Sequence, residues 1–538
     1  GAWVRSWLMG EPASEPPFEV GDNVLVIAYY ASAEVGCILS LGWPVPTNVV
    51  DLFAEFRVAT NGRALPGQTG LLAALRFFGV DHAVNDETKD AMRQLAMRGG
   101  AYDHDERATL LAYCETDIEA LRALLPEMER NLDIDRALLR GRYMVAAARM
   151  EHVGVPIDAP ALAVLRDRWT DVRDRLGYLA SLRYPGVFDG ARFVERGFVR
   201  YLERRRLEWP RLPSGRLKLD DDTFKDMVRS RPDLRLLHEA RRTLARLRAV
   251  DLPVGTDRRA RTILGAFSAK TGRNQPSNSR FIFGMPAWLR SLIRPAPGMS
   301  IAYVDWSQQE FGIAGALSGD EAMKAAYVSG DPYMAFAILA GAAPPGATKA
   351  THEAVREIYK VVVIATQYMM GAASLATQLG VAEAYAADLL RQHRKAFRRY
   401  WAWSDDVAAS ARLRGRMQTA FGWSIVVGLL DDRERSIRNW PIQSTGAEML
   451  RIACVLAIER GVRVCAPVHD ALLIEAPSAE IEGAVATTQA AMREASGIVL
   501  DGFSLRADAK VFAHPERYVD PRGAETWARV FSMLGVQP

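Results

Sequence analysis

Cysteine is scarce in this sequence, which has 4 cysteines in 538 residues and no CxxC pair or zinc-ligand spacing. This argues against a disulfide-stapled secreted fold and predicts reduced thiols in a cytosol-like compartment. No apolar run reaches the roughly 18 to 20 residues that span a membrane, so we expect no membrane partner. The N-terminus lacks both an apolar signal-peptide core and a Met. We therefore expect a cytoplasmic chain that begins inside a longer natural protein.

The charge of the chain is unevenly distributed, although its composition is that of a soluble globular protein of about two to four domains. Residues 191–250 hold 17 Lys and Arg against 9 Asp and Glu, and residues 256–300 hold 8 against 1. Such a basic middle is either a solvated helical surface or a surface for a polyanion. Nucleic acid is the first candidate for that polyanion.

Hydrophobic periodicity predicts an α/β chain with a long helical middle. The expected elements are an α/β unit at 23–60, a helix at 106–130, helices over 136–252, a strand at 300–306, helices over 317–415 with one long helix at 349–379, a helix at 445–461, and two strands at 462–477. The breaks in the helical middle coincide with Pro- and Gly-containing stretches.

Two aspartates interrupt strand-like apolar runs. Asp305 ends the run IAYV, and Asp470 lies between VCAPV and ALLIEA. Each alone fits a strand-end or turn residue. If the two strands are neighbours, however, the carboxylates repel one another unless a cation lies between them. Two Mg²⁺ ions about 3.5–4 Å apart, held by such carboxylates, serve in-line phosphoryl transfer.

Between these aspartates, Arg356 and Lys360 are four residues apart and therefore share a helix face. The face is either a solvated basic surface or a grip for a triphosphate. An Asp strand, an Arg-x-x-x-Lys helix and a His-Asp hairpin follow in this order after a basic region, which favours the functional interpretation.

The stretch DWSQQEFGIAGALSGD, residues 305–320, resembles the first palm motif of the family A DNA polymerases. The resemblance runs from about residue 145 to the C-terminus. It implies a right-hand fold with an antiparallel-sheet palm and helical fingers and thumb. It also implies that Asp305 is a metal ligand and that Glu310 is a steric gate against the 2′-hydroxyl, with Gln308 beside it in the nucleotide site.

The fingers motif of that family resembles REIYKVVVIATQYMMG. By this match Arg356 and Lys360 hold the phosphates, and Tyr368 lies by the templating pair. Ile364 stands where the family has a stacking aromatic ring, and Met369 stands where it has Gly. Both positions therefore depart from the pattern.

VHDALL resembles the third motif, which makes Asp470 the second metal ligand and places His469 near the primer end; Ala471 stands where Glu is usual. Further matches imply contacts to primer-template DNA, largely on the minor-groove side, by Arg273, Arg435, Asn439 and Gln443. Tyr333 stands where many members have a His that faces the triphosphate.

The N-terminal region is similar to the 3′–5′ exonuclease domain of the family, which has a ribonuclease-H-like fold. The matching residues are Glu34, Asp51, Tyr113 and Asp117. The D-x-E motif of the opening strand has no counterpart. Either that strand was removed from this chain, or the domain is a remnant that braces the polymerase. The lack of a 5′-nuclease domain is typical of phage members.

The resemblance therefore predicts five segments and a mechanism. The segments are an exonuclease-like domain lacking its opening strand at 1–135, mostly thumb at 136–262, palm at 263–320, fingers at 321–430 and palm again at 431–538. We expect a monomeric DNA polymerase that uses dNTPs, primer-template DNA and two Mg²⁺ ions, with Mn²⁺ as a possible substitute, impaired proofreading, and an unknown processivity factor if any. The alternatives are a single-subunit RNA polymerase, which Glu310 disfavours, and a catalytically dead DNA-binding scaffold, which the intact motifs disfavour.

Overall fold

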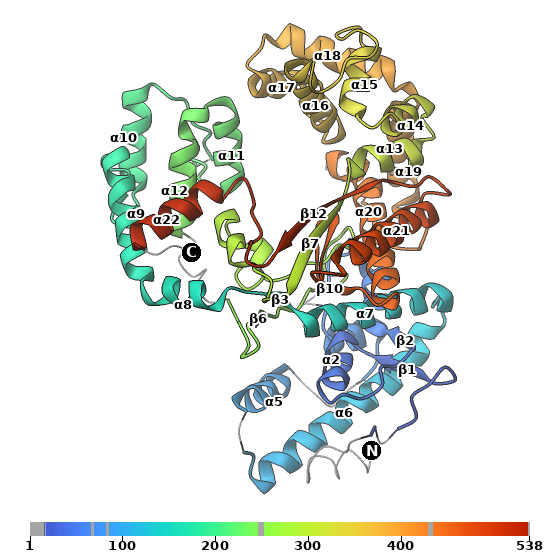
Figure 1. Cartoon of the computed structure of the whole chain (residues 1–538). Coiled ribbons are helices and arrows are strands. Elements are labelled where there is room, and N and C mark those ends of the chain that lie inside the picture. The colour runs from blue at the N-terminus through green and yellow to red at the C-terminus, as the bar shows by residue number, and fades with distance from the viewer. Residues whose placement is uncertain are drawn as a thin grey trace.

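A four-stranded antiparallel sheet lies at the centre of this computed structural model (Figure 1). The structure describes residues 15–16, 18–65, 69–81, 86–99, 101–212, 214–245, 252–428 and 434–535. The strand order is β10 (Arg463–Val468), β11 (Ala471–Pro477), β7 (Met299–Trp306) and β12 (Ala507–Ala513). The strands predicted at 300–306 and 462–477 are confirmed, and β7 pairs with β11 directly.

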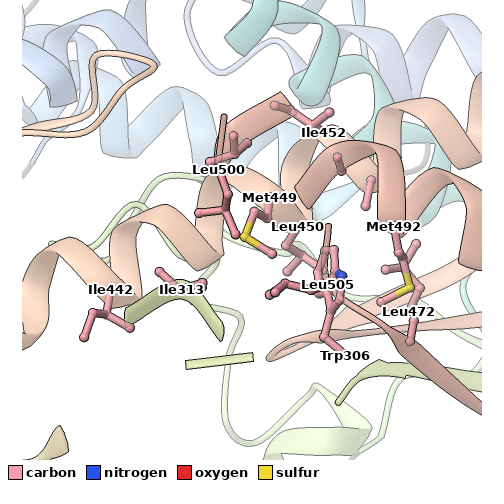
Figure 2. Packing of buried hydrophobic residues seen from close by; sticks show 14 of the residues in the cluster. Trp306, Ile313, Ile442, Met449, Leu450, Ile452, Leu472, Met492, Leu500 and Leu505 are labelled. Atoms are coloured by element: carbon pink, nitrogen blue, oxygen red, sulfur yellow. The ribbon is translucent and has the colours of Figure 1, made fainter. Parts of the chain in front are cut away.

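Two long helices, α20 (Glu434–Glu459) and α21 (Ile481–Val499), pack on this sheet. Figure 2 shows Met449 and Leu450 of α20 and Met492 of α21 beside Leu472 and Trp306 from the strands. These side chains are at most 6% exposed. Burying each of them contributes roughly 1.5–3 kcal/mol, so the sheet is a firm support for residues at its strand ends.

A helical lobe lies between β7 and β10 in sequence and forms one end of the molecule (Figure 1). Its helices are α13 (Gln309–Ser318), α14 (Glu321–Val328), α15 (Pro332–Leu339), α16 (Glu353–Gln367), α17 (Ala372–Leu379), α18 (Glu383–Ala396) and α19 (Arg398–Arg414). The single helix predicted at 349–379 is wrong, because the chain breaks between α16 and α17. Met369 has a φ of 52°, a left-handed conformation that ends a helix and that glycine adopts more readily.

A second helical group lies on the other side of the sheet (Figure 1). It comprises α8 (Ala159–Asp167), α9 (Trp169–Arg183), α10 (Glu195–Arg205), α11 (Asp221–Ser230) and α12 (Arg235–Ala245), and the C-terminal α22 (Ala524–Leu534) packs on α9. Phe198, Trp209 and Phe224 form its aromatic core, with ring centroids 4.7–5.6 Å apart. The short pairs β3 (Val155–Pro156) with β6 (Arg259–Ala260) and β4 (Phe188–Asp189) with β5 (Arg192–Phe193) connect these helices.

The N-terminal unit, residues 18–129, contains the parallel pair β1 (Leu25–Ala28) and β2 (Asn48–Asp51). Its helices are α2 (Ser32–Ser40), α3 (Leu52–Thr60), α4 (Leu71–Phe78), α5 (Asp86–Arg98) and α6 (His104–Glu129). The α/β unit predicted at 23–60 is confirmed. Its assignment to a ribonuclease-H-like fold stays a prediction.

Helix α7 (Ile134–Val153) joins the N-terminal unit to the sheet, since it packs against both β2 and β10. Its Gly141 permits this approach, because a Cβ there would lie 1.7 Å from the carbonyl oxygen of Val49. None of the helices within the described residues is long and apolar enough to cross a membrane.

Candidate active site

The centre of the site is a pair of aspartates at the ends of neighbouring strands. Asp305 is near the end of β7, and Asp470 is in the turn between β10 and β11, where the Trp306 N–H donates to the Asp470 carbonyl over 3.3 Å. Burial, followed by repulsion from Asp470, raises the pKa of Asp305, and burial also raises the pKa of Asp470. Oδ1 of Asp305 is buried and has no hydrogen-bond partner among the described residues. A divalent cation would relieve both the repulsion and this unpaired oxygen.

A third acid, Asp508, lies opposite Asp305 on β12, while Ala471 faces Asp305 from β11. Asp508 accepts a hydrogen bond from the Ser307 hydroxyl and adds to the repulsion on Asp305. Sequence reasoning missed Asp508 because its position depends on the register between β12 and β7. A search of the described part of the chain finds no group of three or more His, Cys, Asp or Glu side chains arranged to hold a metal ion. The metal-binding prediction thus rests on the aspartate pair.

Helix α16 and its C-cap residue align four predicted nucleotide-site residues at intervals of four. They are Arg356, Lys360, Ile364 and Tyr368. Both cations are already paired with acids: Arg356 with Asp331 and Glu357, and Lys360 with Glu357 over 3.3 Å. A polyphosphate would therefore have to replace these acids.

The ring of Tyr333 lies under the Arg356 guanidinium, 5.2 Å from the ring centroid, and this cation–π contact orients the guanidinium. Ile364 and Tyr368 are 41% and 44% exposed, so both offer an apolar surface on the same helix to a flat base.

Glu310 connects the sheet side of the site with α16. It is in the first turn of α13, and it accepts a hydrogen bond from the Tyr368 hydroxyl over 3.0 Å. The Arg273 guanidinium is 3.8 Å from the same carboxylate. Burial raises the pKa of Glu310, against the opposing effect of Arg273. Gln308 adopts a left-handed φ of 48° at the start of α13, and its side-chain oxygen is 3.5 Å from Nη2 of Arg506.

A cavity of about 910 Å³ opens beside this cluster. Its lining includes Tyr368, Lys270, Thr271, Arg435, Asn439 and Gln443. The last three recur every four residues along α20, so they share one face. Cations and amides on one wall suit the phosphates and base edges of nucleic acid. Arg273 follows Lys270 and Thr271 in the same loop.

His469 precedes Asp470 in the hairpin turn, where its φ is 57°. Burial, partly offset by the negative charge of Asp470, lowers the pKa of His469. The lowered pKa favours the neutral imidazole, which can both donate and accept a hydrogen bond.

The acids predicted to form an exonuclease site lie in the N-terminal unit. Asp51 is fully buried and caps α3, since its carboxylate accepts hydrogen bonds from the N–H groups of Tyr30, Ala31 and Ala54. Burial raises the pKa of Asp51 to about 6 despite these bonds. Both oxygens of Asp51 are thus engaged by the backbone.

Glu34 on α2 lies within electrostatic reach of Asp51 and Asp117. Desolvation by surrounding atoms, with repulsion from those two acids, raises the pKa of Glu34 to about 7. Tyr113 and Asp117 are one turn apart on α6, and partial burial followed by the charge of Asp117 raises the pKa of Tyr113 to about 12. The role of these residues as an exonuclease site stays a prediction.

The sequence of this chain is similar to those of several known proteins. Residues 274–511 match the sequence profile of the family described as DNA polymerase family A. The chain is 30% identical over 211 residues to the thermostable DNA polymerase I of Thermus thermophilus, covering 37% of this chain and 25% of that protein. It is 26% identical over 254 residues to the DNA polymerase of Mycobacterium phage L5, covering 45% of this chain and 40% of that protein. The chain thus spans about a quarter of the Thermus relative.

Among solved structures, the chain is similar to the polymerase domain of Pol1 from M. smegmatis, determined in complex with DNA primer-template and dNTP. The TM-score is 0.65 at 20% identity, and the match covers 95% of this chain and 87% of that one. The two chains share a mixed helix-and-sheet fold over nearly their whole length.

Proposed function

Because residues 274–511 belong to DNA polymerase family A, we propose that this chain is a template-directed DNA polymerase that extends a primer 3′-hydroxyl with dNTPs. The observation that carries the proposal is the Asp305–Asp470 pair, which lies at adjacent strand ends beside Glu310. In this proposal the four-stranded sheet is the palm, the α14–α18 lobe is the fingers, and α9–α12 form the thumb. The segment boundaries 136–262, 263–320, 321–430 and 431–538 belong to the same proposal.

Asp305 and Asp470 fit a divalent cation because they are close, mutually repelling and incompletely hydrogen-bonded. We assign two Mg²⁺ ions to these carboxylates, and Mn²⁺ is a possible substitute. When bound, the ions would activate the attacking 3′-hydroxyl and stabilise the leaving pyrophosphate. Arg356 and Lys360 exchange their acidic partners for the triphosphate and neutralise it. Tyr333 supports Arg356 in that role, and Ile364 and Tyr368 contact the base.

Arg435, Asn439 and Gln443 hold the primer-template from the wall of the cavity, together with Arg273 and His469. Contacts to the minor-groove acceptors that all correct pairs share test the shape of a pair without reading its sequence. Binding through phosphates makes the affinity strongly dependent on salt. A monomer, an unidentified processivity factor and a cytoplasmic location remain predictions.

We propose that proofreading is impaired in this chain. The engagement of both Asp51 oxygens by three backbone N–H groups supports this proposal, since it leaves this carboxylate little capacity to bind a metal ion. In this proposal the N-terminal unit is a structural support for the polymerase region.

Primer extension tests the proposed function. With Mg²⁺ and a labelled primer-template, we expect extension with dNTPs, little with rNTPs, and no shortening of the primer without nucleotides. Preferred use of rNTPs would instead support a single-subunit RNA polymerase, and shortening would show an active exonuclease. No extension with either nucleotide would overturn the enzyme assignment.

Lys360→Ala is expected to raise the KM for dNTPs about 10- to 100-fold with a smaller change in DNA affinity. A charge-assisted hydrogen bond to a phosphate contributes about 1.5–3 kcal/mol, and Lys360 is exchangeable because its ion pair with Glu357 is half-exposed. Steady-state kinetics at saturating primer-template measure the effect. Lys349→Ala is the matched control, because Lys349 is exposed in the loop before α16. An unchanged KM in Lys360→Ala would contradict the triphosphate assignment.

A further inference from the structure

A short segment at the end of α3 connects the N-terminal unit to two segments that contribute to the cavity lining. Asn61 is 1% exposed, and its Nδ2 donates to the carbonyls of Lys270 over 2.7 Å and Ser424 over 2.8 Å. Ser424 belongs to the hairpin of β8 (Arg416–Gln418) and β9 (Ser424–Val426). Its hydroxyl donates to the Val58 carbonyl, and the Val426 N–H donates to the Asn61 carbonyl. One buried amide thus joins the N-terminal unit to two segments far away in sequence.

Long-range donors hold several backbone carbonyls of the loop at residues 267–273, in addition to local backbone bonds such as that from the Gly272 N–H to the Ala269 carbonyl. Arg57, also on α3, donates to the carbonyls of Phe267 over 3.3 Å and Ser268 over 3.1 Å. The Lys270 carbonyl accepts from the indole N–H groups of Trp423 and Trp440 as well as from Asn61.

The end of the loop is fixed in the same way. The Gly272 carbonyl accepts from Arg451 over 2.7 Å. Gly272 has a φ of 75°, and the Trp423 ring packs where a Cβ would lie, at 3.0 Å. The carbonyls of four loop residues are therefore fixed from outside the loop.

This loop contains residues of the cavity and of the neighbouring Glu310 cluster. Lys270 and Thr271 line the cavity, and Arg273 reaches toward Glu310. A loop that binds a ligand keeps its geometry when neighbouring groups hold its backbone, because less order must then be gained on binding. The N-terminal unit and the loop also share an apolar core that includes Phe53 and Phe267. Here the donors of the N-terminal unit, Arg57 and Asn61, are directed at backbone carbonyls of this loop and of the hairpin beside it.

We propose that Asn61 and Arg57 are positioning residues, through which the N-terminal unit orients loop 267–273 so that Arg273 is ready to bind primer-template DNA. The claim that Arg273 binds primer-template DNA rests on the proposed function. The claim that Asn61 and Arg57 hold the loop does not.

Hydrogen–deuterium exchange on the full chain without DNA tests the geometric step. Asn61→Ala removes two donors and is expected to raise the exchange of residues 267–273. Arg57→Met, which keeps the aliphatic stem, provides a second variant should Asn61→Ala fail to fold. Asn48→Ala is the matched control, since Asn48 donates to the Asp22 carbonyl within the N-terminal unit. Unchanged exchange in both test variants would overturn the inference.

Fluorescence anisotropy with primer-template DNA tests the functional step. We expect Asn61→Ala to raise the Kd about 5- to 20-fold and Asn48→Ala to leave it within twofold. In an Arg273→Ala background, Asn61→Ala should add less than twofold, because its effect passes through Arg273. An equal penalty in both backgrounds would overturn the positioning role. If the unaltered chain bound no primer-template, the proposed function and the DNA role of Asn61 would both fall, while faster exchange in Asn61→Ala would still support the hold on the loop.

Discussion

Asp305→Asn or Asp470→Asn is expected to lower the rate of nucleotide incorporation at least about 10³-fold, while the Kd for primer-template stays within about threefold. Stabilising the charge that develops on the transferred phosphoryl group contributes several kcal/mol, and about 4 kcal/mol corresponds to 10³ in rate. A neutral amide cannot supply the charge that holds a divalent cation. Neither aspartate lines the cavity that we assign to duplex DNA, so the loss should fall on the chemical step.

The same substitutions should not destabilise the free protein. Burial raises the pKa of both carboxyl groups, and repulsion from Asp470 raises that of Asp305 further, so replacing one of them by Asn removes a like-charge contact. We therefore expect an unchanged or higher Tm without metal, which separates lost chemistry from lost folding. Asp501→Asn is the matched control, because Asp501 is exposed and its φ of 51° suits Asn equally well.

Rapid-quench measurement of single-nucleotide incorporation, with anisotropy and thermal melting on the same samples, gives all three quantities. Near-normal incorporation by either aspartate variant would show that the metal-ligand assignment is wrong. A large drop in DNA affinity would instead place that aspartate in duplex binding.

The strands that carry the aspartates were predictable from sequence because each is a short apolar run with a charged residue near its end. The neighbourhood of the two strands was only a hypothesis at that stage, and the pairing of β7 with β11 confirms it. The register of β12 has no such signal, since the segment around Asp508 alternates in polarity without indicating which residue will face Asp305. An acid beside the site was missed for that reason.

The break between α16 and α17 was missed because helical periodicity continues through it. Met369 takes a left-handed φ there without being Gly, Asn or Asp, the residues that usually mark such a position. The resemblance did flag the position, since the family has Gly where this chain has Met369.

In the N-terminal unit, prediction from sequence is limited for a different reason. Asp51 is the last residue of a strand and precedes a helix, a position equally suited to a metal ligand and to an N-cap, and only the backbone donors around it distinguish the two. Asn61 and Arg57 belong to no recognised pattern. Their partners lie more than 200 residues away, and such contacts leave no local trace in a sequence.

Glu310→Ala is expected to reduce the selection of dNTPs over rNTPs about 10²-fold. The Glu310 side chain is held in place by the Tyr368 hydroxyl at 3.0 Å and by Arg273 at 3.8 Å, so it forms a fixed wall between α13 and α16. Removing the carboxylate and one methylene group opens space for a 2′-hydroxyl, and steric selection of this size is worth roughly 1–3 kcal/mol. The selection is measured as the ratio of kcat/KM for a dNTP to that for the matching rNTP.

Glu310→Gln separates volume from charge. It has the same shape and can still accept from Tyr368, so it should keep most of the selection if Glu310 acts as a wall. If Glu310→Gln accepted rNTPs as readily as Glu310→Ala, charge rather than volume would exclude the ribose hydroxyl. If Glu310→Ala selected dNTPs as well as the unaltered chain, the wall would lie elsewhere, and the argument from Glu310 against an RNA polymerase would be lost. Tyr368→Phe should lie between the two, because it removes one of the two contacts that hold the carboxylate and leaves the wall in place but less fixed.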